Sequence, residues 1–534
     1  MTFRNLLSIN FNHDGAAALL VDGALAGYVN TERFSRKRRH PGIRECDLDE
    51  LLDQASLRLA DVDLVLLCNL DTIDSPEIPA QYGSDLKETW FEFTLAPDLH
   101  TVSIRGRQFR CEVNPPHHEL HAALAFFTSP YDSAMVLSTD PTGWEVFAGI
   151  GTDLRRLPRP ALNYQAPNLY ADVAFELFGS ALSGAGKVMG LAPYGRDDAP
   201  AGVDFGAVRD LGALRGAAAG RPVLIGDENA SWNARLAWLI QQVLDAQLTA
   251  LAGILREQCA AAGVAARLCL GGGTALNSVS NQIAFERSGF DDLYLHPACG
   301  DDGTAIGAAL WYWHARLGHR RRAWSHAERM YSVRRYDAGH ATTHERYRDR
   351  IRLEPCAAYV QRAADLIAEG AIVGWFQGAS EIGPRALGNR SLLADPRLAT
   401  LPARLNERVK FREAFRPFAP AVLREAAGEW FSISDSPFML RVAAVCSRAV
   451  PAVRHVDGTA RLQTVAADDN PAFHELLTRF AARTGLPVLL NTSFNTCGEP
   501  IVETPEHALE TFLACDIDVL AFPGLLVHKR LATH

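Results

Sequence analysis

Three short apolar runs open the chain and are separated by turn-forming residues. The runs cover residues 6–11, 16–21 and 25–30, and the turns contain His13-Asp14-Gly15 and Asp22-Gly23. Apolar runs of this length joined by Asp-Gly turns predict antiparallel strands connected by tight hairpins. The first domain must therefore be built around a β-sheet that begins with a meander.

A second pair of apolar runs repeats the pattern at residues 134–139 and 146–151, with Asp140-Pro141-Thr142-Gly143-Trp144-Glu145 between them. Each copy carries Asp and Gly in its turn and is followed by helical stretches. The repetition predicts a duplicated α/β fold of the actin-like, sugar-kinase-like (ASKHA) kind, in which both turns face one cleft.

The rest of the pattern predicts one long helix and a second domain. Apolar residues at helical spacing predict the helix between residues 230 and 262. A strand at 268–270 leads into the turn Gly271-Gly272-Gly273, which either approaches a phosphate or is a simple tight turn. The Arg- and His-rich segment 331–355 is predicted as a linker between domains at 1–330 and 356–534. In the second domain, apolar strands alternate with helices, which predicts an α/β sheet.

Charge and cysteine content exclude several classes of protein. The chain has 534 residues, a net charge of -9 and a pI near 6.0, so neither a nucleic acid nor a membrane surface is expected as a partner. Its 10 cysteines include no Cys-x-x-Cys pair and are expected to be reduced thiols. The sequence has no signal-peptide pattern and no apolar run of membrane-spanning length. We therefore expect a cytoplasmic protein.

His117 and His121 are four residues apart and would share one face of a helix. Asp140 ends an apolar strand, and Asp301 lies in a turn, so both offer carboxylates. Two imidazoles and carboxylates with open positions suit a catalytic ion such as Fe(II) better than a structural zinc. Taken alone, however, this histidine spacing is more often an ordinary part of a helix surface.

Six motifs follow one another along the chain, at residues 32–37, 186–195, 374–391, 415–420, 490–495 and 498–502. They read ERFSRK, GKVMGLAPYG, GWFQG through GPRALGNRS, FRPFAP, LNTSFN and GEPIV. Together they closely resemble the O-carbamoyltransferase family, which includes nodulation-factor, cephalosporin and tobramycin carbamoyltransferases. The resemblance spans nearly the whole chain.

The resemblance implies a TsaD-like, actin-like N-terminal domain and a YrdC-like C-terminal domain. The C-terminal domain would make carbamoyladenylate from carbamoyl phosphate and ATP, with Mg(II) bound to the ATP. The N-terminal domain would transfer the carbamoyl group to the hydroxyl of a small molecule, for which we favour a natural-product intermediate such as those of antibiotic biosynthesis. The resemblance is also compatible with a homodimer.

In the C-terminal half, the resemblance implies that Arg385, Lys410 and Ser493 contact carbamoyl phosphate and nucleotide. Arg390, Arg416 and Asn491 are the further nucleotide-binding candidates, although Asn491 could equally form a turn. Arginine matches phosphate oxygens with a two-pronged donor, whereas lysine supplies a compact charge.

In the N-terminal half, the resemblance implies that His117, His121, Asp140 and Asp301 bind the metal. Iron is the family's metal, with zinc or manganese as alternatives in a Lewis-acid role. His13 matches an active-site histidine that would act as general base or bind the carbamoyl oxygen, and Lys37 would offset charge on the adenylate. The adenylate would be held by Gly271, Gly272, Gly273 and Asn277, with Lys187 lining the same cleft. Asp302 is a weaker ligand candidate, and His118 and Glu119 lie off the ligand face.

One departure and several alternatives remain. Many relatives have a shorter Asp-Gly-x-Gly-Glu turn where this chain has Pro141 and Trp144, and Trp144 is predicted to shape the acceptor pocket.

A metallopeptidase is disfavoured because His118-Glu-Leu-His121 is one residue short of the His-Glu-x-x-His motif. Threonylcarbamoylation of tRNA is disfavoured by the acidic charge. A kinase or nucleotide sensor leaves the C-terminal arginines unexplained, and carbamoylation of an amine or guanidine remains a lesser option.

Overall fold

Two sheets in the N-terminal half share one strand order. The computed structural model describes residues 3–69, 91–95, 100–113, 115–196, 203–218, 223–224, 231–336 and 345–530. In the first sheet the order is β3-β2-β1-β4-β7-β6-β5, and in the second it is β10-β9-β8-β13-β14. Both β1 and β8 pair antiparallel with the following strand and parallel with a later one. The duplication predicted from the two hairpins is confirmed.

The strands of the first sheet are β1 (Asn5–Asn10), β2 (Ala16–Val21), β3 (Ala24–Asn30), β4 (Leu64–Cys68), β5 (Phe91–Leu95), β6 (His100–Ile104) and β7 (Arg107–Val113). Those of the second are β8 (Ser133–Asp140), β9 (Gly143–Ile150), β10 (Asp153–Leu157), β13 (Arg267–Gly271) and β14 (Asp292–Leu295). β1, β2, β4 and β8 are buried along nearly their whole length, because helices or further strands cover both faces.

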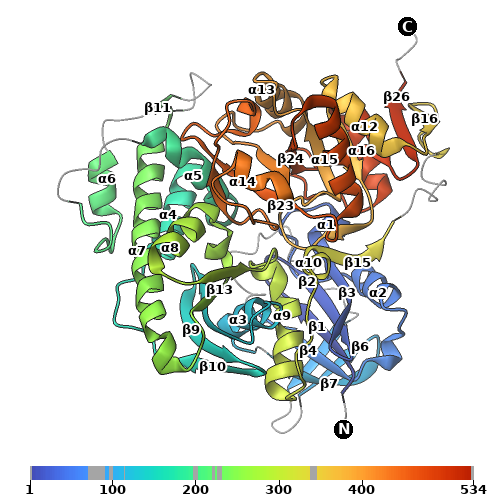
Figure 1. Cartoon of the computed structure of the whole chain (residues 1–534). Coiled ribbons are helices and arrows are strands. Elements are labelled where there is room, and N and C mark those ends of the chain that lie inside the picture. The colour runs from blue at the N-terminus through green and yellow to red at the C-terminus, as the bar shows by residue number, and fades with distance from the viewer. Residues whose placement is uncertain are drawn as a thin grey trace.

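Two helices lie between these sheets. The helix α3 (His117–Phe127) packs against α9 (Thr304–Leu310), which in turn contacts β1, β2 and β4. The approach is close enough that a Cβ on Gly307 would lie 2.2 Å from the Leu120 carbonyl oxygen. Figure 1 shows α3 and α9 side by side between the two lobes. A helix that joins both lobes is well placed to carry residues into a site between them.

Further helices cover the second sheet, namely α4 (Ala166–Phe178), α5 (Ala181–Leu191), α7 (Ala234–Ala262) and α8 (Ser278–Ser288). The predicted long helix is α7, which begins after the cap Asn233 and ends at Gly263 in the left-handed conformation. Among the described residues, α7 is the one helix long and apolar enough to cross a membrane, but 61% of its most apolar stretch is buried in the protein.

The C-terminal half is built on a mixed sheet of eight strands. Their order is β16-β26-β25-β17-β19-β24-β20-β23. The strands are β16 (Ile351–Pro355), β17 (Val373–Phe376), β19 (Arg390–Ala394), β20 (Ala419–Leu423), β23 (Gln463–Val465), β24 (Val488–Ser493), β25 (Val519–Phe522) and β26 (Leu525–Lys529). The helices α12 (Tyr359–Ala368), α15 (Pro471–Thr484) and α16 (Pro505–Ala514) pack on it. The predicted α/β character is confirmed for both halves.

The predicted linker contributes a strand near each end. Its start forms β15 (Tyr331–Arg335), which pairs with β18 (Ala379–Glu381), and its end forms β16, which pairs with β26. Residues 337–344 of this segment lie outside the described residues. The smaller elements are α1 (Thr31–Ser35), α2 (Glu45–Gln54), α6 (Gly212–Ala218), α10 (His326–Met330), α13 (Leu401–Leu405), α14 (Ala427–Trp430), β11 (Val223–Leu224), β12 (Ser231–Trp232), β21 (Val442–Ala444) and β22 (Thr459–Arg461).

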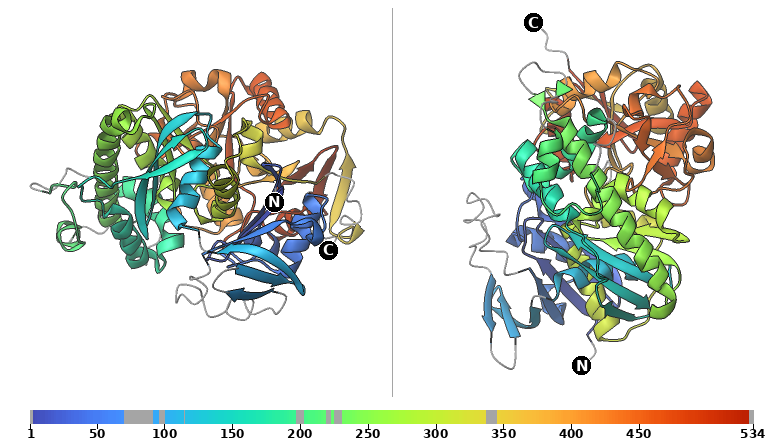
Figure 2. Two further views of the ribbon diagram at one scale, coloured as in Figure 1. Left: turned by 90° about the horizontal axis from the view of Figure 1, so that it is seen from below. Right: turned by 90° about the vertical axis from the view of Figure 1, so that its left-hand side faces the viewer.

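The two halves are packed directly against each other. Ile382, Leu387, Phe438 and Met439 from the C-terminal half belong to the same buried apolar cluster as the core of the second lobe. Asn281 on α8 donates to the Leu440 carbonyl oxygen at 3.0 Å. Figure 2 shows the C-terminal half, in orange and red, against both lobes of the N-terminal half. The buried interior is therefore continuous between the two halves.

Candidate metal centre and anion site

The helix α3 brings His117 and His121 together as the spacing predicts. It starts at His117 directly after Pro116, so both imidazoles project from its first two turns. Their Nε2 atoms lie 3.2 Å apart. His121 is buried, whereas His117 is half-buried at the edge of the site. The helix thus offers two nitrogen ligands from one face.

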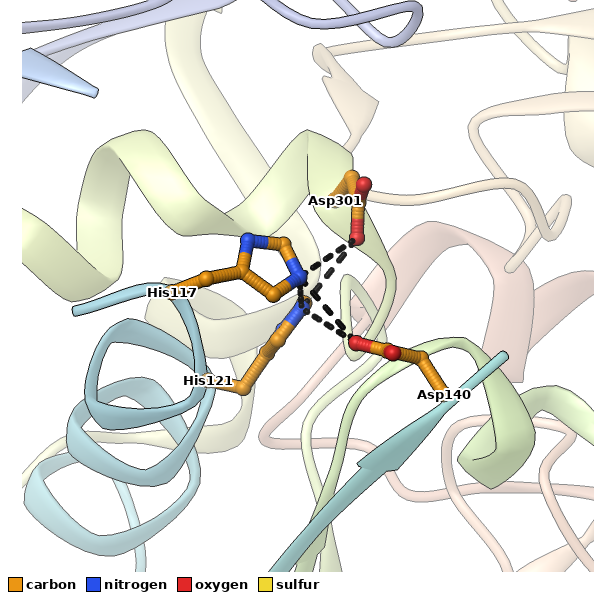
Figure 3. A group of neighbouring side chains, drawn as sticks. All are labelled: His117, His121, Asp140 and Asp301. Atoms are coloured by element: carbon orange, nitrogen blue, oxygen red, sulfur yellow. Dashed lines mark hydrogen bonds and ion pairs between the residues drawn. The ribbon is translucent and has the colours of Figure 1, made fainter. Parts of the chain in front are cut away.

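Asp140 and Asp301 complete a group that we call the metal group, with His117 and His121 (Figure 3). One ligand atom of each residue lies within 4.8 Å of the other three. Asp140 Oδ2 is 3.1 Å from His117 Nε2, and Asp301 Oδ1 is 3.1 Å from His121 Nε2. These carboxylates come from the end of β8 and from the loop after β14, so three separate elements converge.

The metal group fits a divalent first-row ion. Ligand atoms about 2.0–2.2 Å from a shared ion lie about 3.0–3.4 Å apart, and the His-carboxylate separations run from 3.1 to 3.8 Å. Burial opposes ionisation of Asp140, but its hydrogen bond with His117 and the nearby His121 lower its pKa to about 2. Burial likewise opposes ionisation of Asp301, yet His117, His121 and His13 hold its pKa well below the usual value. Two ionised carboxylates and two imidazoles match the charge that such an ion requires.

His13 lies beside the metal group. Its Nε2 is 3.7 Å from Asp301 Oδ2, and its Nδ1 is 3.1 Å from Asp14 Oδ2. Asp14 is itself paired with Arg39 at 3.1 Å. Burial lowers the pKa of His13, but Asp14 and Asp301 outweigh that effect and raise it. An imidazole that faces a carboxylate through each ring nitrogen can take up a proton, as a general base must.

The other predicted neighbours have different surroundings. His118 binds Ser138 Oγ at 2.9 Å, and burial lowers its pKa to about 4. Glu119 lies on the half-buried side of α3, where burial raises its pKa. Asp302 is not part of the metal group; burial and then Asp14 raise its pKa to about 8. Lys37 follows the short helix α1 and is exposed.

The unusual turn after Asp140 supports its carboxylate. Asp140 Oδ1 accepts hydrogen bonds from the backbone N–H and hydroxyl of Thr142, at 2.7 and 2.5 Å, and from the Gly143 N–H at 3.2 Å. These bonds leave Oδ2 directed at His117. Trp144 packs edge-to-face on Tyr164 at 5.6 Å and lies under Arg159 at 5.3 Å. The indole is half-buried.

A second polar site in the C-terminal half consists of Arg385, Arg412, Arg416 and Arg461, which we call the cation cluster. Burial and then Arg416 lower the pKa of Arg412 to about 9, and burial lowers the pKa of Arg385 to about 10. Burial and then the three other arginines hold the pKa of Arg461 well below its usual value. Arg416 lies 3.7 Å from Glu413, which also pairs with Lys187 at 2.6 Å.

The cation cluster has unused hydrogen-bonding capacity. Among the described residues, the buried Nε atoms of Arg385 and Arg461 have no hydrogen-bond partner, nor does the buried Oδ1 of the neighbouring Asn491. A buried arginine without partners costs free energy unless an anion binds it. This arrangement therefore suits an anionic ligand such as a phosphate.

Two predicted anion-binding residues instead have their donors engaged within the protein. Arg390 donates to the carbonyl oxygens of Gln377, Gly378, Asn389 and Glu503, and its guanidinium lies 3.6 Å from the Phe376 ring centre. Those bonds use four of its five donors, so Arg390 chiefly organises the backbone. The Lys410 ammonium binds Ser493 and Asn495, through their side chains and carbonyl oxygens. Burial and then Arg412 lower the Lys410 pKa well below its usual value.

The sequence reasoning missed Arg412 and Arg461. Arg412 stands two residues after Lys410 in the same stretch, so this position gave a usable signal. Arg461 ends the short strand β22 in a region without any recognisable pattern. Only the fold brings it beside Arg385.

The glycine turn packs tightly beside the metal group. A Cβ on Gly272, whose φ is 87°, would lie 2.2 Å from the Thr139 carbonyl oxygen, and one on Gly271 would lie 2.8 Å from that of His121. Asn277 caps α8 by accepting from the Ser280 N–H. The glycines are thus required for close packing, whatever else they bind.

A pocket of about 620 Å³ lies next to Asn277. Its lining includes Met189, Trp238, Gln241, Asp245 and Val279, with Asp457 from the C-terminal half. Gln241 exchanges hydrogen bonds with Asn277 at 3.1 and 3.3 Å. Burial raises the pKa of Asp245 to about 6. Apolar and amide side chains around one cavity suit a planar polar ligand.

One loop joins the two sites. Arg385 Nη2 donates to the Leu276 carbonyl oxygen at 3.2 Å, at the end of the turn that follows Gly273. A Cβ on Gly383 would lie 2.4 Å from the carbonyl oxygen of Pro297, four residues before Asp301. Buried Arg33 holds this loop by donating to the Gly383 carbonyl oxygen at 2.6 Å. The loop at residues 383–385 therefore belongs to the cation cluster and also packs against segments that lie next to the metal group.

Comparison with known proteins decides the family. A family model described as carbamoyltransferase N-terminus matches residues 6–205 and 224–310, and one described as carbamoyltransferase C-terminus matches residues 364–529. The chain belongs to the carbamoyltransferase family. The resemblance found in the motifs is thereby confirmed, and the protein is a transferase enzyme.

Relatives of this carbamoyltransferase cover most of its length. It is 34% identical over 556 residues to "Nodulation protein NolNO" of Sinorhizobium fredii, covering 98% of this chain and 80% of the relative. It is 30% identical over 515 residues to the "3'-hydroxymethylcephem-O-carbamoyltransferase" of Amycolatopsis lactamdurans, covering 92% of each. It is also 32% identical to the "Uncharacterized protein sll1178" of Synechocystis, covering 97% of this chain and 95% of the relative.

Proposed function

We propose that this carbamoyltransferase forms carbamoyladenylate from carbamoyl phosphate and ATP in a YrdC-like C-terminal half. The actin-like, TsaD-like N-terminal half then transfers the carbamoyl group to an acceptor hydroxyl. The observation that carries the proposal is the pairing of two buried sites of opposite character. The cation cluster has unpaired donors for phosphates, and the metal group stands next to a histidine base.

In the C-terminal half, the chemistry is activation of a carbamate. Hydrolysis of carbamoyl phosphate releases phosphate and leaves carbamate, whose oxygen attacks the α-phosphorus of ATP and displaces pyrophosphate. Three anions must approach one another, so fixed positive charge is needed before the reaction starts. Arg385, Arg416 and Arg461 supply this charge, with Mg(II) bound to the ATP phosphates. Lys410 holds the Ser493–Asn495 loop in place.

In the N-terminal half, the acceptor oxygen attacks the carbamoyl carbon and AMP leaves. His13, oriented by Asp14, takes the hydroxyl proton. His117, His121, Asp140 and Asp301 would hold Fe(II) or another divalent ion, which supplies Lewis-acid polarisation of the carbamoyl oxygen or the acceptor hydroxyl. The pocket beside Asn277 accommodates the nucleoside of the adenylate, with Gln241 and Asp245 as polar contacts.

The acceptor we favour is a small natural-product hydroxyl. The named cephem relative supports a small molecule as acceptor. A net charge of -9 disfavours a tRNA acceptor. Carbamoylation of an amine or guanidine is the lesser alternative, because a nitrogen nucleophile needs no deprotonation by His13 once it is neutral.

The direct test measures pyrophosphate release from ATP and carbamoyl phosphate without any acceptor. We expect release that requires both substrates, and little release from an Arg461→Met variant. The matched control is Arg479→Met, because Arg479 is an exposed arginine on α15 that pairs with Glu475. Absence of pyrophosphate release from the unmodified protein would contradict the proposal. Mass spectrometry of reactions with candidate acceptors would then identify the product by its added carbamoyl mass.

A further inference from the structure

Three buried asparagines connect two members of the metal group. Asn10 lies at the end of β1, Asn12 in the following turn and Asn69 directly after β4. Their side chains are 0%, 3% and 7% exposed. Buried amides are costly unless their donors and acceptors are paired, so the direction of each bond here is informative.

The asparagines form a continuous chain of hydrogen bonds between His117 and Asp301. His117 Nδ1 is 3.0 Å from Asn69 Oδ1, and Asn69 Nδ2 donates to Asn10 Oδ1 at 2.7 Å. Asn10 Nδ2 then donates to Asn12 Oδ1 at 2.8 Å, and Asn12 Nδ2 donates to Asp301 Oδ2 at 2.6 Å. We call Asn10, Asn12 and Asn69 the asparagine relay.

The Asp301 end fixes the direction of the relay. An ionised carboxylate can only accept hydrogen bonds, so Asn12 must present its NH₂ group to Asp301. Independently, the backbone N–H of Asp14 donates to Asn12 Oδ1 at 3.0 Å, which places the amide oxygen on the other side. Asn12 therefore has one orientation.

The orientation of Asn10 is also fixed by groups that can only accept. Its Nδ2 faces the carbonyl oxygens of Asp14 and Asp301, at 2.9 and 3.1 Å, as well as Asn12 Oδ1, so two hydrogens are shared among three acceptors. Its Oδ1 must then face Asn69, and Asn69 can meet an oxygen only with its NH₂ group. The remaining atom of the Asn69 amide, Oδ1, faces His117 Nδ1. That nitrogen must carry the proton.

We propose that Asn69, held by Asn10 and Asn12, is a positioning residue that fixes the metal-binding tautomer of His117. Protonation at Nδ1 leaves the lone pair on Nε2, which is the atom that faces Asp140 and His121. The inference rests on the metal site of the proposed function. By contrast, the buried Nδ1 of His121 has no partner among the described residues, so only one histidine is controlled in this way.

The backbone at Asn69 suits this role. Its φ is 58°, a left-handed conformation that asparagine and aspartate adopt more readily than other residues with a Cβ. The chain therefore turns sharply after β4 and points the amide at α3. An aspartate can replace Asn69 without backbone strain, and it reverses the bond towards Asn10 while adding one negative charge.

The test compares metal affinity in four full-length proteins stripped with a chelator. They are the unmodified protein, Asn10→Ala, Asn69→Asp and the double variant, each titrated with Co(II) against a chromophoric competitor. Asn10→Ala removes the acceptor that orients Asn69, so we expect affinity to fall about 10- to 100-fold. Aspartate at position 69 can only accept, so the double variant restores the Nδ1–H tautomer and recovers affinity.

The single variant Asn69→Asp should lower metal affinity, whereas the same substitution raises it when Asn10 is already replaced by alanine. With Asn10 present, its second carboxylate oxygen faces Asn10 Oδ1, and the repulsion weakens metal binding. If Asn10 and Asn69 only supported the fold, the double variant would bind the metal more weakly than either single variant. The control is Asn281→Ala, which removes a buried asparagine that donates to the carbonyl oxygens of Ala275 and Leu440. We expect this control to bind Co(II) as the unmodified protein does.

A second measurement needs no metal. In protein labelled with ¹⁵N-histidine, the metal-free His117, assigned by its loss in His117→Ala, is expected to carry its proton on Nδ1. It should lose this preference in Asn10→Ala. Unchanged affinity in Asn10→Ala, or a double variant weaker than Asn10→Ala, would overturn the relay. If the unmodified protein itself bound no stoichiometric Co(II), the metal site would be at fault, and the titration of that protein alone reveals this.

Discussion

The metal group and the cation cluster are both at least half-buried, but their charges are balanced in different ways. In the metal group, two carboxylates face two imidazoles, and the asparagine relay and the Thr142 turn satisfy the outer oxygens. In the cation cluster, four arginines face one nearby carboxylate, Glu413, and two Nε atoms are unpaired. The first site is organised before it binds anything. The second is electrostatically strained until an anion enters.

The largest expected difference lies between the two half-reactions. His117→Ala should reduce carbamoyl transfer about 100-fold or more, because it removes a metal ligand. It should leave acceptor-independent pyrophosphate release intact. Arg461→Met should instead reduce acceptor-independent pyrophosphate release, while Co(II) affinity stays unchanged. Pyrophosphate and product assays on both variants check this. Equal loss of both half-reactions in each variant would contradict the division of labour.

A buried carboxyl that hydrogen-bonds neutral side chains gives the next largest effect. Asp245 Oδ1 accepts from Ser280 and Gln241, and burial raises the pKa of Asp245 to about 6. The folded state thus binds its proton more tightly than the unfolded state, so stability falls as pH rises from about 4 to 6 and stays lower above.

Asp245→Asn keeps both hydrogen bonds and removes the charge. At pH 8 it should increase the free energy of unfolding by about 2–3 kcal/mol, and at pH 4 it should change little. Denaturant titrations at the two pH values measure the difference. A variant less stable than the unmodified protein at pH 8 would show that the Asp245 charge is compensated.

Removing one charge from each site should change stability in opposite directions. Without ligands, Arg461→Met should stabilise the protein by about 1–3 kcal/mol, because it removes a buried unpaired charge. In the metal-free protein at pH 7, Asp140→Asn should destabilise by about 1–3 kcal/mol, because the lowered pKa of Asp140 contributes stability above its unfolded pKa of about 4. That contribution is lost as pH falls towards 2. Denaturant unfolding of the chelator-treated proteins measures both, and effects of the same sign would remove the contrast.

The smallest effect concerns the acceptor. Trp144 lies two residues beyond Thr142, whose N–H donates to Asp140, and its indole is half-buried against Tyr164. Trp144→Ala should change the ratio of kcat/KM between two acceptors up to about tenfold, as expected for one lost packing contact. It should not change pyrophosphate release. Competition between acceptors measures the ratio, and an unchanged ratio would show that the indole only packs on Tyr164.

Local patterns predicted the elements that carry the metal ligands. Asp-Gly turns located the hairpins at β1–β2 and β8–β9, and the four-residue spacing of His117 and His121 placed both on one face of α3. These are short-range properties, because turn chemistry and helix periodicity act within a few residues. The two strands in segment 331–355 were not predicted, because β15 and β16 pair with strands far along the chain.

Local sequence patterns could not predict the roles of individual arginines. Arg385 and Arg390 stand five residues apart in one motif, yet Arg390 is directed at backbone carbonyls while Arg385 has an unpaired Nε. Both side chains carry the same charge and reach. Arg390 uses four of its donors on carbonyl oxygens, whereas Arg385 donates to one and keeps an Nε without a partner among the described residues. The strands around each side chain decide this difference.

The sequence by itself determined the duplicated hairpins, the histidine pair and the carbamoyltransferase family, because these depend on residue types at short, fixed spacings. Only the tertiary structure brought Asp301 to His121, Arg461 to Arg385, and Asn10, Asn12 and Asn69 into one relay. Hydrogen-bond direction and charge balance belong to atoms that meet in space. Apart from Asn10 and Asn12, these partners lie tens to hundreds of residues apart, and no local pattern encodes that distance.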